Sequence, residues 1–168
     1  TGRWPKEPVD FTGKRVAVIG TGATGIQAIP IIAQTAAHVT VFQRTPNYVL
    51  PARNYTLSDG ERQAIRTDYD SIWDRAREHF FGVAMDAPGG ALQDATPAEQ
   101  QRVLEWGWEV GGFRYIFETF SDLLIDERSN EVASEFIRNK IRAIVRDPET
   151  AELLCPKDYP LVGKRPPL

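Results

Sequence analysis

Three glycines with the spacing G-x-G-x-x-G follow a short apolar stretch near the start of the chain. In VAVIGTGATGIQ they are Gly20, Gly22 and Gly25. In a dinucleotide-binding loop the first glycine permits a tight turn, the second lets the backbone approach a pyrophosphate, and the third lets a helix pack on a strand. The amides at the start of that helix attract the negative charge. Glycine spacing alone is a weak signal, but an apolar strand before it, a helix that opens at it and a second strand after it together predict a dinucleotide site.

The predicted cofactor-binding residues of this loop are Gly20, Thr21, Gly22, Ala23, Thr24, Gly25 and Gln27. Thr21 and Thr24 have two interpretations. Their hydroxyls could donate to phosphate, or they could cap the helix that follows the loop.

A second polar group follows about twenty residues later, in VFQRTPNYVLPARN. An NAD site places Asp or Glu at the end of the second strand, where it accepts from the ribose 2′-hydroxyl. This chain has Gln43, Arg44 and Thr45 there. Because a guanidinium fork with a neighbouring hydroxyl suits a 2′-phosphate, we expect NADP rather than NAD. The alternative is that Arg44 is a solvated loop charge.

The other reactive side chains give weaker signals. His38 and His79 lack partner cysteines or histidines at ligand spacing, so we expect no metal site. Cys155 is the single cysteine and is more typical of a small buried apolar group than of a nucleophile. Lys164 and Arg165 lie in a proline-rich stretch, and residue types alone do not separate a functional pair from a solvated one.

Composition excludes several classes of partner. The 168 residues carry a net charge of -3, which predicts no attraction to nucleic acid or to anionic membranes. No apolar run approaches the roughly 20 residues of a membrane helix. One cysteine fits a reducing compartment, so we expect a cytoplasmic protein. The chain begins at Thr1, and we expect it to be a fragment of a longer protein.

The elements that must position these residues form a strand-helix-strand unit. Residues 14–20 have the pattern of a strand buried on both faces, residues 24–36 of a helix, and residues 38–43 of a second strand. Two parallel strands joined by a helix are a βαβ unit. The predicted fold class is therefore α/β, a Rossmann-like NADP-binding unit with an incomplete sheet.

Beyond residue 57 the chain reads as helical. Ser58 and Glu61 form a capping box that starts one long amphipathic helix with apolar residues as far as Phe80. Thr96, with Pro97 and Glu99, repeats this signal for a helix to about residue 107. The remaining expectations are a loop over 82–95, helices over 113–120 and 133–144, and a short helical turn after Pro148.

This layout predicts three segments. Residues 1–54 begin the NADP-binding domain, residues 55–150 form an all-helical insertion, and residues 151–168 return to the NADP-binding domain. Because two strands cannot shield their own faces and edges, the rest of the sheet is expected outside this sequence.

The sequence resembles the NADPH-binding region of Baeyer–Villiger flavin monooxygenases, the family of cyclohexanone and phenylacetone monooxygenases. Three stretches carry the resemblance: TGRWPKEPVDFTGKRVAVIGTGATGIQ, VFQRTPNYVLPARN and EFIRNKIRAIVRDPETAELLCPKDYPLVGKRPP. They cover essentially the whole chain. Trp4 and Pro5 resemble the end of the family's fingerprint, whose histidine, like the family's FAD glycine motif, is expected upstream of Thr1.

The resemblance implies a function for the parent protein. In this family NADPH reduces FAD, and O2 then converts a ketone to an ester or lactone. By resemblance Arg44, Thr45 and Lys164 hold the 2′-phosphate of NADP(H), and Arg165 is the catalytic arginine. FAD is bound mainly by a flavin domain of the same parent chain, so this fragment alone is expected to be inactive.

Two alternatives stay open at this point. The parent could be another NADPH-dependent flavin monooxygenase of the N-hydroxylase type, or a reductase. The helix-rich middle also fits a non-catalytic nucleotide-binding or interaction module.

Overall fold

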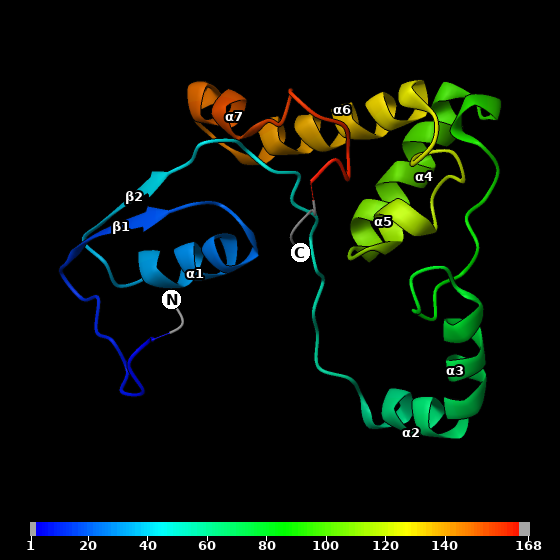
Figure 1. Ribbon diagram of the computed structural model, residues 1–168, viewed down its shortest axis with the longest axis horizontal. Coiled ribbons are helices and arrows are strands. Elements are labelled where there is room, and N and C mark those ends of the chain that lie inside the picture. The colour runs from blue at the N-terminus through cyan, green and yellow to red at the C-terminus, as the bar shows by residue number, and fades with distance from the viewer. Residues whose placement is uncertain (1–2, 165–168) are drawn as a thin grey trace.

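A computed structural model describes residues 3–164 as a small βαβ unit joined to a larger helical body (Figure 1). The βαβ unit consists of β1 (Arg15–Ile19), α1 (Ala23–Ala33) and β2 (His38–Phe42). The helical body contains α2 (Asp59–Thr67), α3 (Tyr69–Glu78), the 3-10 turn η1 (Leu92–Asp94), α4 (Pro97–Val110), α5 (Arg114–Phe117), α6 (Glu127–Ile144) and α7 (Pro148–Leu154). No described helix is both long and apolar enough to cross a membrane.

The two strands are parallel and adjacent, and α1 packs against both. Their register runs from Arg15 opposite His38 to Ile19 opposite Phe42. This arrangement confirms the mixed α/β class and the strand-helix-strand order. The register also brings the ends of both strands to one edge of the sheet, where the glycine loop begins.

The prediction that the first strand is buried on both faces is wrong for the part of the chain that the structure describes. Residues of β1 alternate between exposed and half-buried, and Ile19 is 88% exposed. The reason is that α1 covers only one side of a two-stranded sheet.

The capping box of Ser58 and Glu61 is present at the start of α2, as predicted. The single long helix is not, because the helix breaks at Asp68 into α2 and α3. On either side of the break, the Thr67 hydroxyl donates to the Gln63 carbonyl at 3.0 Å and the Ser71 hydroxyl to the Asp68 carbonyl at 2.9 Å. Hydroxyls bound to carbonyls one turn back commonly bend helices.

The predicted helix start at Thr96 is also confirmed, and α4 runs to Val110. The expected helix over 113–120 shrinks to the single turn α5. The Thr119 hydroxyl donates to the Tyr115 carbonyl at 2.7 Å and so competes with the backbone for that acceptor. By contrast, α6 begins six residues earlier than predicted, at Glu127, where Asp126 caps it.

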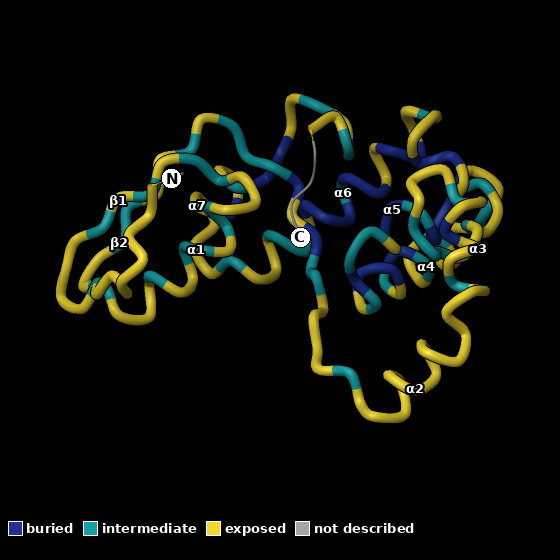
Figure 2. Tube along the Cα trace, turned by 60° about the horizontal axis from the view of Figure 1, so that its bottom comes forward, coloured by how far each residue is buried: buried dark blue, intermediate teal, exposed yellow. Residues whose placement is uncertain are grey.

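The apolar core lies among α4, α5 and α6 (Figure 2). Its centre includes Tyr115, Leu123 and Ile137, which are fully buried. Tyr48 from the segment after β2 and Leu161 from the return segment also belong to this core. The segment that leaves the βαβ unit after β2 and the return segment are thus both fixed to the helical body.

A buried carboxylate ties the loop before α4 to the start of α6. Asp122 accepts hydrogen bonds from the Leu92 amide at 2.8 Å and the Ser129 hydroxyl at 2.6 Å. Burial alone would raise the pKa of Asp122, but these bonds and one from the Gln93 amide leave its pKa below the usual value. The ionised form is therefore the one that stabilises the fold.

Replacing Asp122 by Asn lowers the free energy of unfolding at pH 7 by about 1–3 kcal/mol, because a buried donor then faces an amide NH2. A depressed folded-state pKa contributes stability above the unfolded pKa of about 3.9, and this contribution is lost as the pH falls below it. Urea titrations at pH 7 and pH 3 measure this, and the difference in free energy of unfolding between Asp122→Asn and wild type should be smaller at pH 3. The exposed Asp70→Asn variant is the control, and equal midpoints for Asp122→Asn and wild type at pH 7 would contradict the assignment.

Candidate nucleotide site

The glycine loop has the backbone that a close approach to phosphate requires. Gly20 has a φ of 94°, a region that L side chains avoid, and its amide donates to the Phe42 carbonyl at 2.8 Å. A Cβ on Gly25 would lie 2.4 Å from the Gly20 carbonyl oxygen, so only glycine lets α1 begin this close to the turn. A Cβ on Gly22 would meet nothing within 4 Å, which leaves open space beside the turn.

The N-terminus of α1 faces this loop without a side-chain cap. Gly22 is the N-cap residue and no acidic residue lies in the first turn, so neither Thr21 nor Thr24 caps the helix. The first helical bond runs from the Ile26 amide to the Gly22 carbonyl at 3.0 Å. The amides of Ala23, Thr24 and Gly25 consequently have no acceptor within the helix. Such an end attracts anions.

A hollow lies at the carboxyl ends of β1 and β2. The residues that line it are Ile19, Gly20, Thr21, Gly22, Phe42, Arg44, Thr45, Asn47 and Lys164. Six of the sequence-predicted site residues therefore meet at one place, although Lys164 is separated from Gly20 by most of the chain. Arg44 and Lys164 supply two positive charges, and neither forms an ion pair with a carboxylate among residues 3–164.

Tyr159 brings Lys164 to the hollow. The Lys164 ammonium lies over the Tyr159 ring, 4.5 Å from its centroid. The Tyr159 hydroxyl donates to the Pro46 carbonyl at 2.5 Å and lies 3.0 Å from the Asn47 side-chain oxygen. The return segment is thereby fastened to the loop that carries Arg44 and Thr45.

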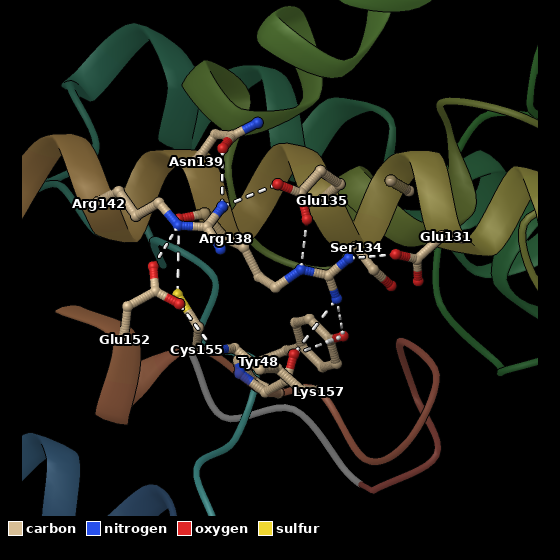
Figure 3. Close-up of polar contacts among 12 residues, drawn as sticks. Tyr48, Glu131, Ser134, Glu135, Arg138, Asn139, Arg142, Glu152, Cys155 and Lys157 are labelled. Atoms are coloured by element: carbon tan, nitrogen blue, oxygen red, sulfur yellow. Dashed lines mark hydrogen bonds and ion pairs between the residues drawn. The ribbon is translucent and has the colours of Figure 1, made fainter.

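Arg138 of α6 anchors both chain segments that lead to the hollow (Figure 3). Its guanidinium donates to the Tyr48 hydroxyl at 3.0 Å and to the Pro156 carbonyl at 3.3 Å. It also pairs with Glu131 and Glu135. Burial would lower the pKa of Arg138, but these carboxylates raise it, so the group stays charged.

Ion pairs hold α7 against α6. Glu152 pairs with Arg142 at 2.6 Å and with Lys157 at 2.7 Å, and these bonds lower the pKa of Glu152 to about 2. Cys155 is buried next to them, its thiol 3.8 Å from the Arg138 carbonyl, and burial raises its pKa. A thiol with a raised pKa is a poor nucleophile, in agreement with its interpretation as an apolar group.

Gln43 connects α7 to the glycine loop. Its side-chain oxygen accepts from the Thr21 hydroxyl at 3.0 Å, and its side-chain nitrogen donates to the Leu153 carbonyl at 2.9 Å. Nothing in the residue pattern indicated a contact between positions 43 and 153.

The remaining predicted residues are less central, and one cannot be placed. Ala23 and Thr24 lie in the first turn of α1 and Gln27 in the next, outside the lining of the hollow. Arg165 lies outside the described residues. Sequence reasoning missed Tyr159, Tyr48 and Arg138, because nothing in the residue pattern indicated that these side chains meet. No described group of His, Cys, Asp or Glu could hold a metal ion.

Comparison with known proteins finds monooxygenases that match nearly the whole chain. No protein-family model matches. A phenazine N-monooxygenase from Lysobacter antibioticus is 43% identical over 99% of this chain and 30% of its own length. A Baeyer–Villiger monooxygenase from Pseudooceanicola batsensis is 41% identical and a cyclohexanone 1,2-monooxygenase from Acinetobacter sp. 40% identical, with the same two coverages.

Solved structures of monooxygenases also superpose on nearly the whole chain. A steroid monooxygenase bound to NADP superposes with a TM-score of 0.92 at 42% identity, covering 98% of this chain and 31% of that one. OTEMO in complex with FAD and NADP superposes with a TM-score of 0.95 at 38% identity, covering 99% and 32%. The chain thus spans about a third of the length of the relatives it matches. It is a homologue of one segment of the Baeyer–Villiger monooxygenases.

Proposed function

We propose that this chain is the NADPH-binding segment of a FAD-dependent Baeyer–Villiger monooxygenase that oxidises a ketone to an ester or lactone with O2. The observation that carries the proposal is the hollow, in which the glycine turn, Arg44, Thr45 and Lys164 meet. The homology to Baeyer–Villiger monooxygenases supports the same assignment.

The residues present fit NADP. The pyrophosphate would lie beside Gly22, where the backbone carries no side chain, against the amides at the start of α1. The 2′-phosphate would be held by Arg44, Thr45 and Lys164. An acidic residue, which an NAD site needs for the ribose hydroxyl, is missing from the lining of the hollow. The chain therefore selects the phosphorylated cofactor by charge.

The oxidation chemistry belongs to the full-length protein. FAD, when bound, supplies the electron transfer from NADPH to O2, and we propose that regions beyond this segment hold most of it. Of the residues in this chain, we propose Arg165 as the catalytic group, because a guanidinium keeps its charge and stabilises developing negative charge. The described residues contribute by binding and orienting the nicotinamide cofactor.

The test uses the full-length protein purified with FAD. We expect ketone-dependent consumption of NADPH and O2, with an ester or lactone as product in equal amount. Mass spectrometry identifies the product, and a reaction without ketone measures the uncoupled background. NADPH binding without any substrate-dependent consumption, over a panel of cyclic and linear ketones, would favour a non-catalytic nucleotide-binding module.

A second candidate activity is N-oxidation of an aromatic heterocycle. The 43% identity to a phenazine N-monooxygenase favours it specifically. The same assay distinguishes the two, because a phenazine would give an N-oxide whereas a ketone gives a rearranged ester. NADPH oxidation with neither product formed, and hydrogen peroxide in its place, would indicate a reductase.

Tyr159→Phe tests how Lys164 is positioned. Loss of the hydroxyl removes the bond to the Pro46 carbonyl but keeps the ring under the ammonium. We expect the Kd for NADPH to rise about 3- to 10-fold, the value of one hydrogen bond. Fluorescence titration measures it, and Tyr69→Phe, on exposed α3, is the matched control. An unchanged Kd for Tyr159→Phe would show that the hydroxyl does not position the cation.

A further inference from the structure

Gln43 lies between two groups that differ in whether they can donate a hydrogen bond. On one side is the Leu153 carbonyl, 2.9 Å from the side-chain nitrogen, and on the other the Thr21 hydroxyl, 3.0 Å from the side-chain oxygen. A backbone carbonyl has no proton to give, so the NH2 of Gln43 must point toward Leu153. The amide orientation is thereby fixed by chemistry, and the oxygen of Gln43 faces Thr21.

This orientation determines where the Thr21 proton goes. A hydroxyl has one proton, and an amide oxygen only accepts, so Thr21 donates its proton to Gln43. The Thr21 side chain then has only lone pairs left to present to the hollow. It therefore has no proton to offer a phosphate oxygen while the bond to Gln43 is formed.

The other end of the connection is held firmly. Leu153 lies in the last turn of α7, where carbonyls lack an amide partner within the helix, so Gln43 satisfies one of them. The ion pair between Glu152 and Arg142 connects that turn to α6. The glycine loop is in this way tied to the helical body across 110 residues of sequence.

We propose that Gln43 is a positioning residue, and that the phosphates of the cofactor are bound by backbone amides of the glycine loop without the Thr21 hydroxyl. This rests on the proposed NADP site and deepens it. The bridge Thr21–Gln43–Leu153 sets the position of the loop, whereas Arg44 and Lys164 select the 2′-phosphate. Gln43 should therefore affect NADPH and NADH equally.

The experiment measures Kd for NADPH and NADH in the full-length protein with the variants Gln43→Leu, Thr21→Val, Thr21→Ser and the double variant Gln43→Leu/Thr21→Val. We expect Gln43→Leu and Thr21→Val each to raise both Kd values by about 3- to 10-fold, the range of one or two hydrogen bonds. Thr21→Ser keeps the hydroxyl and restores wild-type binding. The double variant should bind no worse than Gln43→Leu alone, since both changes break the same bridge.

Hydrogen exchange adds a readout that a merely structural role would not change. NADPH should slow exchange of the amides at the end of α7 in wild type and in Thr21→Ser, but not in Gln43→Leu. Additive losses in the double variant would mean that Thr21 binds phosphate directly and would overturn the proposal, as would unchanged affinity in Gln43→Leu. Wild-type protein that does not bind NADPH would instead refute the proposed function.

Discussion

Replacing Gly25 by Ala should destabilise the protein by about 3 kcal/mol and abolish measurable nucleotide binding. The new Cβ would lie 2.4 Å from the Gly20 oxygen and 3.2 Å from the Gly20 carbonyl carbon. Both are backbone atoms of the turn, so α1 must move away from β1 to relieve the clash. Overpacking at a rigid contact costs about 1–3 kcal/mol and sometimes more. The displaced helix no longer aims its first amides at the hollow.

Gly22→Ala should weaken nucleotide binding without changing the stability of the fold. Its φ is -75° and a Cβ there meets nothing within 4 Å, so the variant should fold with a free energy of unfolding within about 0.5 kcal/mol of wild type. The added methyl group would occupy the open space where we propose that the pyrophosphate lies. We expect the Kd for NADPH to rise about 100-fold, which is about 2.7 kcal/mol.

Urea unfolding and NADPH titration of both variants test this pair, with Gly60→Ala in exposed α2 as the control. Gly60 also has open space around it, and alanine there should stabilise α2 by about 0.5–1 kcal/mol without changing Kd. If Gly22→Ala binds NADPH as wild type does, the phosphates do not lie beside the glycine turn.

Much of the fold follows from local sequence signals. The strands, α1 and the capped starts of α2 and α4 were predicted because apolar period and capping residues act over a few positions. Glycine spacing likewise indicated which backbone positions must lack a Cβ, and Gly20 and Gly25 have the geometry for it. These features depend on neighbours within one turn or one strand.

The rest depends on contacts between distant residues. At the break at Asp68, the Thr67 and Ser71 hydroxyls bond to carbonyls one turn back. Threonine and serine form such bonds in some helices and not in others, so their residue types alone did not predict the break. Arg138 looks like a surface residue of an amphipathic helix, yet it is buried because Tyr48 and Pro156 come to it. The bridge from Thr21 through Gln43 to Leu153 joins three segments, and a single sequence carries no signal for such a meeting.

Arg44→Ala should raise the Kd for NADPH by about 10- to 100-fold and leave the Kd for NADH within about 3-fold. Hydrogen bonds between charged groups contribute about 1.5–3 kcal/mol, and each 1.4 kcal/mol is a factor of ten in affinity. NADH lacks the 2′-phosphate and so loses nothing that the guanidinium provides. Arg44 lines the hollow and has no ion pair among the described residues, so its removal leaves no carboxylate unpaired there.

Two further variants define what the guanidinium does. Arg44→Lys keeps the charge but loses the paired donors, so its Kd for NADPH should fall between wild type and Arg44→Ala. Arg66→Ala, in α2, removes the same charge from an exposed helix in the arm formed by α2 and α3 (Figure 1) and should change neither Kd. Titration of Arg44→Ala, Arg44→Lys and Arg66→Ala with NADPH and NADH gives the preference of each variant as the ratio of its two Kd values. Equal losses for NADPH and NADH in Arg44→Ala would refute the 2′-phosphate assignment, because a guanidinium that binds only what the two cofactors share cannot select between them.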